Sequence, residues 1–211
     1  MQSLTKHARN IGLVAGSALA LAGLAGCASH GSVASAGKPA ISGDQAAAED
    51  AADAKAIARL EHRVAKSPRS ASARAELARA YLAAGRFASA ATTFEDAVAL
   101  GDDNPGTGLG MALAYIGSGR NGQAVAVLDR WQSRIPAADL GLAVALAGQP
   151  AQGVALLSDA VRGGDASPKA RQNLAYAYAL DGRWAEARLV AAQDVPADRL
   201  DARMSEIATA G

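Results

Sequence analysis

The sequence predicts an all-α fold, a solenoid of antiparallel helix pairs with about four repeats and a capping helix at each end. Three observations lead to this prediction. A unit of helix, glycine turn and second helix first occupies residues 74–97 and then recurs to about residue 194. Hydrophobic residues make up 50% of the chain and aromatic residues only 4%, so much of the apolar mass is alanine, which favours closely packed helices. Extended alternating runs of Val, Ile and Thr, which would indicate strands, are missing.

A glycine closes the first helix of each predicted unit. Gly85, Gly119, Gly148 and Gly182 lie 34, 29 and 34 residues apart. Glycine suits the position after a helix end, because a left-handed backbone costs it little. The nearly constant spacing predicts an array in which each helix pair stacks on the next.

Small and large residues recur at fixed places around each of these glycines. The period of 34 and this pattern resemble the tetratricopeptide repeat, although the opening Trp of that family's pattern is absent from all four units. Small residues would let the two helices of a pair approach closely, and large residues would fill the seams between pairs. The alternative is an alanine-rich helical bundle without repeats. The residues that carry the resemblance are Leu77-Ala78, Tyr81, Ala90 and Phe94; Met111-Ala112, Tyr115, Ala124 and Leu128; Leu140-Gly141, Val144, Gly153 and Leu157; and Leu174-Ala175, Tyr178, Ala187 and Ala191.

The third unit is shorter than the others. Its glycine comes five residues early, whereas Pro136 keeps the place that the repeat pattern gives to proline. The missing residues are therefore expected from the first helix of that unit, residues 137–147, which should have about three turns. Two other first helices have a start signal, a capping residue followed by proline, in Asn104-Pro105 and Ser167-Pro168.

Helices before and after the four units are expected to cap the array. Residues 46–66 predict a helix in which Ala56 and Leu60 fall on the Ala and Phe sites of a degenerate half repeat. Residues 197–209 predict a last helix with one apolar face and a charged outer surface, as a terminal repeat requires. The repeat domain is therefore expected to span residues 46–209.

Residues 1–26 have the composition of a secretory signal peptide. Lys6 and Arg9 precede an apolar run of about 16 residues, shorter than the roughly 20 residues that span a bilayer. The only cysteine follows in Leu24-Ala25-Gly26-Cys27, which resembles the lipobox of bacterial lipoproteins. The resemblance implies that residues 1–26 are removed and that Cys27 is lipidated. A plain signal peptide with a chance cysteine and a buried structural cysteine are the alternatives.

The lipidated Cys27 would begin a flexible tether over residues 27–45, a stretch rich in Gly, Ser and Ala. Ala28 follows the cysteine, where lipoproteins retained in the inner membrane of enteric bacteria typically have Asp. The resemblance therefore implies an anchor in the outer membrane of a Gram-negative bacterium, with the protein facing the periplasm. A single cysteine excludes an internal disulfide.

The sequence lacks a catalytic or metal-binding motif, so neither enzymatic activity nor a cofactor, metal or small-molecule substrate is expected. His7, His30 and His62 have no Cys or carboxylate at the spacing of metal ligands. The 21 Lys and Arg residues nearly balance the 20 Asp and Glu residues, which argues against nucleic acid as the main partner. Trp131 and Trp184 are expected to pack in the core.

Tetratricopeptide arrays usually bind a peptide or a helix along a concave face lined by the first helices. The resemblance therefore implies a protein-binding groove, and its mainly apolar character favours an apolar or amphipathic segment as the partner. For each candidate, the alternative is a place in the core or no ligand at all. The groove candidates are Arg79, Leu82, Leu113, Ile116, Leu142, Leu146, Asn173, Tyr176 and Leu180.

A lipobox followed by such an array resembles several envelope assembly lipoproteins. The last unit, residues 169–195, resembles the Flp (tight adherence) pilus assembly lipoproteins of the TadD-like family. This resemblance implies a membrane-anchored periplasmic interaction scaffold, an assembly factor for a pilus or secretion machine. The alternatives are a periplasmic adaptor for cell-wall or envelope maintenance and a chaperone for an exported subunit.

Overall fold

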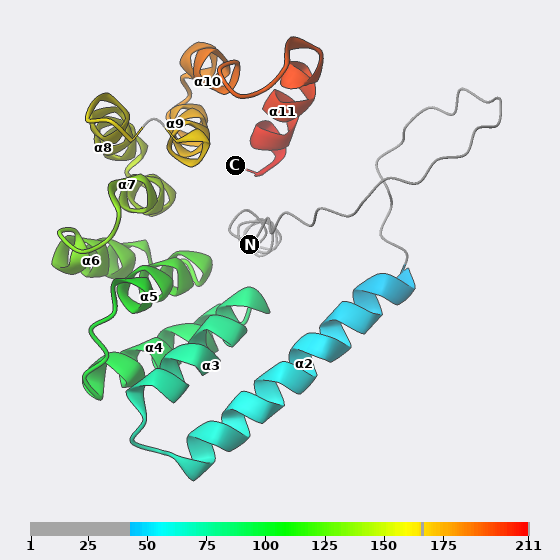
Figure 1. The fold of residues 1–211 in the computed structure, drawn as a ribbon, viewed down its shortest axis with the longest axis vertical. Coiled ribbons are helices and arrows are strands. Elements are labelled where there is room, and N and C mark those ends of the chain that lie inside the picture. The colour runs from blue at the N-terminus through cyan, green and yellow to red at the C-terminus, as the bar shows by residue number, and fades with distance from the viewer. Residues whose placement is uncertain (1–42, 166, 211) are drawn as a thin grey trace.

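The computed structural model describes residues 43–165 and 167–210, where all of the regular secondary structure is helical (Figure 1). The predicted all-α fold is confirmed. The described part of the chain forms ten helices: α2 (Gly43–Lys66), α3 (Ala71–Ala83), α4 (Phe87–Ala99), α5 (Pro105–Gly117), α6 (Asn121–Trp131), α7 (Ala137–Leu146), α8 (Pro150–Arg162), α9 (Pro168–Leu180), α10 (Trp184–Ala191) and α11 (Ala197–Ala210).

Helices α3 to α10 form four consecutive pairs, α3–α4, α5–α6, α7–α8 and α9–α10, and each pair packs on the next. Figure 1 shows the pairs stacked into an arc, with α5, α7 and α9 on its inner side and α6, α8 and α10 on its outer side. Helices α2 and α11 stand at the two ends of the arc. The predicted solenoid with a helix at each end is therefore present.

The expected local signals begin and end these helices. The side chains of Asn104 and Ser167 accept hydrogen bonds from Gly106 N at 2.8 Å and Ala170 N at 3.2 Å, so both predicted caps are confirmed. The four predicted turn glycines have positive φ angles, 69° at Gly85, 75° at Gly119, 92° at Gly148 and 75° at Gly182.

The small residues lie between the two helices of each pair, as expected. In the third pair, a Cβ atom added to Gly141 would lie 2.6 Å from Leu157 Cγ. A Cβ added to Gly153 would lie 2.6 Å from both the Cβ atom of Ala145 and the carbonyl oxygen of Gly141. Real Cβ contacts are longer, so this pair needs glycine at both places. In the other pairs the small residues are at most 1% exposed: Ala78, Ala90, Ala112, Ala124, Ala175 and Ala187.

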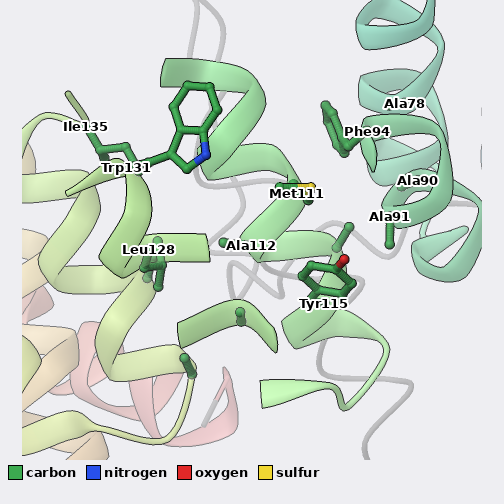
Figure 2. Close-up of a cluster of buried hydrophobic side chains, with 14 of the residues drawn as sticks. Ala78, Ala90, Ala91, Phe94, Met111, Ala112, Tyr115, Leu128, Trp131 and Ile135 are labelled. Carbon is green, nitrogen blue, oxygen red and sulfur yellow. The ribbon is translucent and has the colours of Figure 1, made fainter. Parts of the chain in front are cut away.

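Helix α5 is rich in glycine because aromatic side chains from its neighbours occupy the space beside it. A Cβ atom added to Gly108 would lie 2.5 Å from Trp131 Cδ2, and one added to Gly110 would lie 2.5 Å from Phe94 Cζ. Figure 2 shows Met111 of α5 between Phe94 on one side and Trp131 on the other. Glycine is a poor helix former, so packing rather than propensity holds this helix.

Helix lengths agree with expectation in the third pair and differ in the fourth. Helix α7 has 10 residues against 13 in α5, as the early glycine predicted. Helix α10 has only 8 residues, which was not predicted. Trp184, its first residue, is 45% exposed, so the expectation that this side chain packs in the core was wrong. Trp131 is 3% exposed, which confirms its place in the core.

Helix α2 completes the N-terminal end of the array. It begins at Gly43, three residues before the predicted start at residue 46. Ile57 is buried and Leu60 is half-buried, whereas Ala56 is exposed. In a complete repeat, the alanine at this site of the second helix packs against the first helix of the same repeat. The structure shows no such helix before α2 in its described part, so Ala56 has nothing to contact there.

The predicted signal peptide, the lipidated Cys27 and the tether up to residue 42 lie outside the described residues. Within residues 43–165 and 167–210, no helix combines the length and the apolar character that crossing a bilayer requires.

Candidate protein-binding face

One repeat position defines a row of side chains along the first helices. Arg79, Leu113, Leu142 and Tyr176 are separated by 34, 29 and 34 residues, the same intervals as the turn glycines. Equivalent positions of stacked repeats follow one another along the array. We call these four residues, together with Leu146 beside them on α7, the inner row. Four of the five are apolar or aromatic.

The centre of the inner row is apolar surface that the core leaves partly uncovered. Leu113 of α5 and Leu142 and Leu146 of α7 are all half-buried. None of them belongs to, or packs against, a hydrophobic cluster formed by the described residues. A leucine with this environment keeps apolar area that a partner could remove from water.

Other predicted groove residues contribute to the core. Leu82 and Ile116 are half-buried and pack against the large cluster of α2 to α7, and Leu180 packs against the cluster of α7 to α9. Tyr176 packs against a cluster that contains Ile207 of α11. The C-terminal helix therefore lies next to the last residue of the inner row.

Asn173 is not part of an open surface, contrary to its place among the groove candidates. Its side chain is 7% exposed, and its Nδ2 atom donates a hydrogen bond to the carbonyl oxygen of Ala138 at 3.0 Å. The residue joins α9 to α7 inside the array. Arg79 is exposed as expected, and its Nη2 atom donates to Thr107 Oγ1 at 3.3 Å.

A repeated polar contact, which the sequence reasoning missed, fixes the first half of the array. The hydroxyl of Tyr81 donates to Glu61 Oε1 at 2.6 Å, and the hydroxyl of Tyr115 donates to Glu95 Oε1 at 2.5 Å. In each case the glutamate lies 20 residues earlier, on the helix before the pair. Burial, and then the hydrogen bond to Glu95, raise the pKa of Tyr115 to about 12. The separation of 20 residues between a glutamate and a tyrosine occurs twice in the sequence, and this recurrence could have indicated the contact.

An arginine covers the ring of each repeat tyrosine. Arg86 Cζ lies 4.4 Å from the centroid of the Tyr81 ring, and Arg120 Cζ lies 4.4 Å from that of Tyr115. The backbone brings them together, because Arg120 N donates to Tyr115 O at 2.8 Å across the glycine turn. The same stacking recurs at Tyr178. These cation–π contacts stabilise the turns between the two helices of a pair.

The fourth pair carries an ion pair where the second pair carries an aromatic contact. Arg171 Nε donates to Asp194 Oδ2 at 2.8 Å, and Arg171 Nη2 donates to the other carboxylate oxygen. These bonds lower the pKa of Asp194. The equivalent places, 63 residues earlier, hold Gly108 and Trp131. The same position of the repeat thus holds a bidentate ion pair in the fourth pair and a tryptophan ring packed against a glycine in the second pair.

Two hollows flank the turn between α4 and α5, away from the apolar centre of the inner row. One of about 230 Å³ lies beside Trp131, Arg130 and Arg134, and the other, of about 380 Å³, beside Glu76 and Arg79. Among the described residues, no three His, Cys, Asp or Glu side chains are grouped as metal ligands would be.

Comparison with known proteins agrees with this architecture. Residues 82–146 match the model of the tetratricopeptide repeat family. The helix pairs of this chain are therefore tetratricopeptide-like repeats. No curated protein gives a significant match to it.

Two solved tetratricopeptide structures are similar to this repeat protein. A thermophilic protein of Thermus thermophilus is 25% identical, with a TM-score of 0.57 over 74% of this chain and 90% of that chain. YrrB, described as having an unusual peptide-binding site, is 15% identical, with a TM-score of 0.54 over 75% of this chain and 86% of that chain.

Proposed function

We propose that this tetratricopeptide protein is a membrane-anchored periplasmic scaffold whose inner row binds an apolar or amphipathic segment of a partner protein. The observation that carries the proposal is the apolar surface of Leu113, Leu142 and Leu146, which the core leaves partly exposed. The peptide-binding site of the structurally similar YrrB supports a peptide as the class of ligand. Full burial of an exposed leucine is worth about 1.5–3 kcal/mol, so a helix or strand that covers the remaining third or less of each side chain would gain up to about 0.5–1 kcal/mol per leucine.

The anchor in this proposal is a lipid on Cys27. The tetrapeptide Leu24-Ala25-Gly26-Cys27, the apolar run before it and the uniqueness of the cysteine support this assignment. Ala28 follows Cys27 at the position where lipoproteins retained in the inner membrane of enteric bacteria typically have Asp, and this supports the outer membrane as the destination. Several acyl chains together hold a protein at a bilayer, so the array would remain close to envelope machinery.

The partner class that we favour is a component of a pilus or secretion machine, with the protein acting as an assembly factor. The resemblance of residues 169–195 to the TadD-like lipoproteins supports this choice. A scaffold at the membrane would hold a subunit by an apolar segment until assembly buries that segment elsewhere.

The test is affinity capture from solubilised envelopes with the wild-type chain and with a Leu113→Asp and Leu142→Asp double variant. Leu189→Asp is the control for the inner row, and Cys27→Ala is the variant without the lipid anchor. Leu189 lies on α10 and is 70% exposed, so the control makes the same chemical change outside the inner row. Losing two such leucine contacts should weaken capture about tenfold. Circular dichroism establishes that all four proteins keep their helices.

Three results would decide between the alternatives. Capture of a secretin or pilus component that the double variant loses supports the assembly factor. Capture of only soluble periplasmic proteins, equally by the wild type and by Cys27→Ala, would replace it with the chaperone or adaptor function. Capture that is unchanged in a folded double variant would refute the inner row as the binding site.

A further inference from the structure

We propose that the partner segment is an amphipathic helix that places a carboxylate on Arg79 and apolar side chains on Leu113 and Leu142. The apolar side chains would lie about seven and fourteen residues from the acidic residue, on the same face of the helix. This inference rests on the proposed function of the inner row, and it adds the charge, the conformation and the spacing of the ligand.

Arg79 is the charged residue of the inner row, and no carboxylate of the described residues neutralises it. Its side chain is exposed, and its Nη2 atom donates to a neutral acceptor, Thr107 Oγ1, at 3.3 Å. The other basic residues on α3, α5, α7 and α9 each lie against a carboxylate: Arg74 against Asp96, Lys169 against Asp139 and Arg171 against Asp194. A carboxylate from a partner would therefore complete at Arg79 what the chain itself completes at the others.

The carboxylates nearest to Arg79 already have partners. Three of them line the same hollow of about 380 Å³: Glu76, which binds Arg63; Asp103, which binds Arg134; and Asp102, which accepts from the backbone N of Asn104. The positive charge of Arg79 thus remains available, and the hollow leaves room beside it. A guanidinium group can bind an incoming carboxylate through two parallel hydrogen bonds.

The spacing of the row favours a helix over an extended segment. The first helices α3, α5 and α7 follow one another along the array, and packed helices lie about 8–10 Å apart. Side chains seven residues apart on a helix share one face and are separated by about 10.5 Å along its axis. On a strand, side chains of one face are separated by about 6.7 or 13 Å. A helix therefore matches all three first helices with one interval.

An apolar helix face is already seated at the far end of the row. Helix α11 packs on α9 and α10 with Leu200 and Ile207, which are seven residues apart, and with Met204 between them. Tyr176, the last residue of the inner row, packs against the same cluster as Ile207, and Figure 1 shows α11 at that end of the arc. The clusters of α11 contain no residue of α3, α5 or α7, so this part of the row is left for the partner helix.

The test uses two fluorescent synthetic peptides that differ in one side chain. Both have about 20 residues of alanine and glutamine, enough to form a helix, with two leucines seven residues apart. In the first peptide a glutamate lies seven residues before the first leucine, and in the second a glutamine replaces it. A second pair has the reverse order, because the row does not fix the chain direction of its ligand.

The peptides are titrated by fluorescence anisotropy into the full chain and into its Arg79→Gln and Arg130→Gln variants. Arg130 is the matched control, because it is an exposed arginine on α6, on the outer side of the arc. The glutamate peptide should bind the wild type and Arg130→Gln about three- to tenfold more tightly than the glutamine peptide. The two peptides should bind Arg79→Gln equally, and added salt should reduce the difference in the wild type.

The other outcomes separate failure of this inference from failure of the proposed function. Equal binding of both peptides by the wild type, or a preference for glutamate that Arg79→Gln retains, would overturn the pairing with Arg79 and leave the apolar row intact. Absence of binding by every peptide would overturn the helix and its spacing, whereas the envelope capture would still test the proposed function. Peptide binding that is unchanged in a folded Leu113→Asp and Leu142→Asp double variant would refute both.

Discussion

Gly110 offers a sharp test of how the array is packed. A Cβ atom added there would lie 2.5 Å from Phe94 Cζ and 3.0 and 3.1 Å from the two adjacent ring carbons. Carbon atoms in favourable contact lie about 3.5–4.0 Å apart, so the Phe94 ring would have to move by about 1 Å. Phe94 is 0% exposed and lies between α4 and α5, where it has no solvent to move into.

The matched control is Gly122, which lies in α6. A Cβ atom added at Gly122 would meet nothing within 4 Å. Replacing glycine by alanine in a helix is worth about 0.5–1 kcal/mol in favour of the folded state at either place. Overpacking costs about 1–3 kcal/mol, and only Gly110 incurs that cost. The difference in unfolding free energy between Gly110→Ala and Gly122→Ala should therefore be about 1–3 kcal/mol, with Gly122→Ala more stable than the wild type.

The assay is urea unfolding followed by circular dichroism, together with thermal melting. For a domain of this size, each 1 kcal/mol shifts the melting temperature by about 2–4 °C. Phe94→Leu should relieve part of the cost of Gly110→Ala, because the two changes act on one contact. Equal stability of Gly110→Ala and Gly122→Ala would refute the steric reasoning.

Three further changes test contacts within the array. Tyr115→Phe removes the hydrogen bond to Glu95 and should cost about 1–2 kcal/mol. Because the pKa of Tyr115 is raised to about 12, its contribution is present below about pH 10 and is lost as the pH rises to 12. The difference in urea midpoint between the wild type and the variant should therefore be full at pH 8 and smaller at pH 11. Asp194→Asn should lower the urea midpoint more at pH 7 than at pH 2, because Arg171 lowers the pKa of Asp194 and the contribution of the ion pair decreases as acid protonates the carboxylate. An equal loss at both pH values would contradict this. Asn173→Ala should cost about 1–3 kcal/mol by leaving the buried carbonyl of Ala138 unpaired. It should leave affinity capture of the partner unchanged, and weaker capture by a folded variant would restore the residue to the binding face.

The helix pairs and their turns could be predicted because their signals are local. Asn104 and Ser167 cap their helices through hydrogen bonds that span a few residues. Gly148 could be placed by counting from its neighbours, and the early arrival of this glycine predicted the shortened α7. Counting failed at α10, where no spacing marked the early end of the helix or the exposure of Trp184.

Periodicity identified the candidate binding residues but not the surroundings of each. Leu142 and Asn173 both lie on first helices and were equivalent as candidates. The packing of α9 on α7 buries Asn173 against a carbonyl group, whereas no neighbour fully covers Leu142, which stays partly exposed.

The sequence by itself determined the repeat, its register and its small-residue contacts, since a stacked array repeats one local solution and counting carries that solution from pair to pair. Tertiary structure alone decided which apolar side chains remain available, because exposure depends on residues from helices far away in sequence. Tyr176 shows the difference: its repeat position is readable from the chain, but α11 determines how much of its ring a partner could reach.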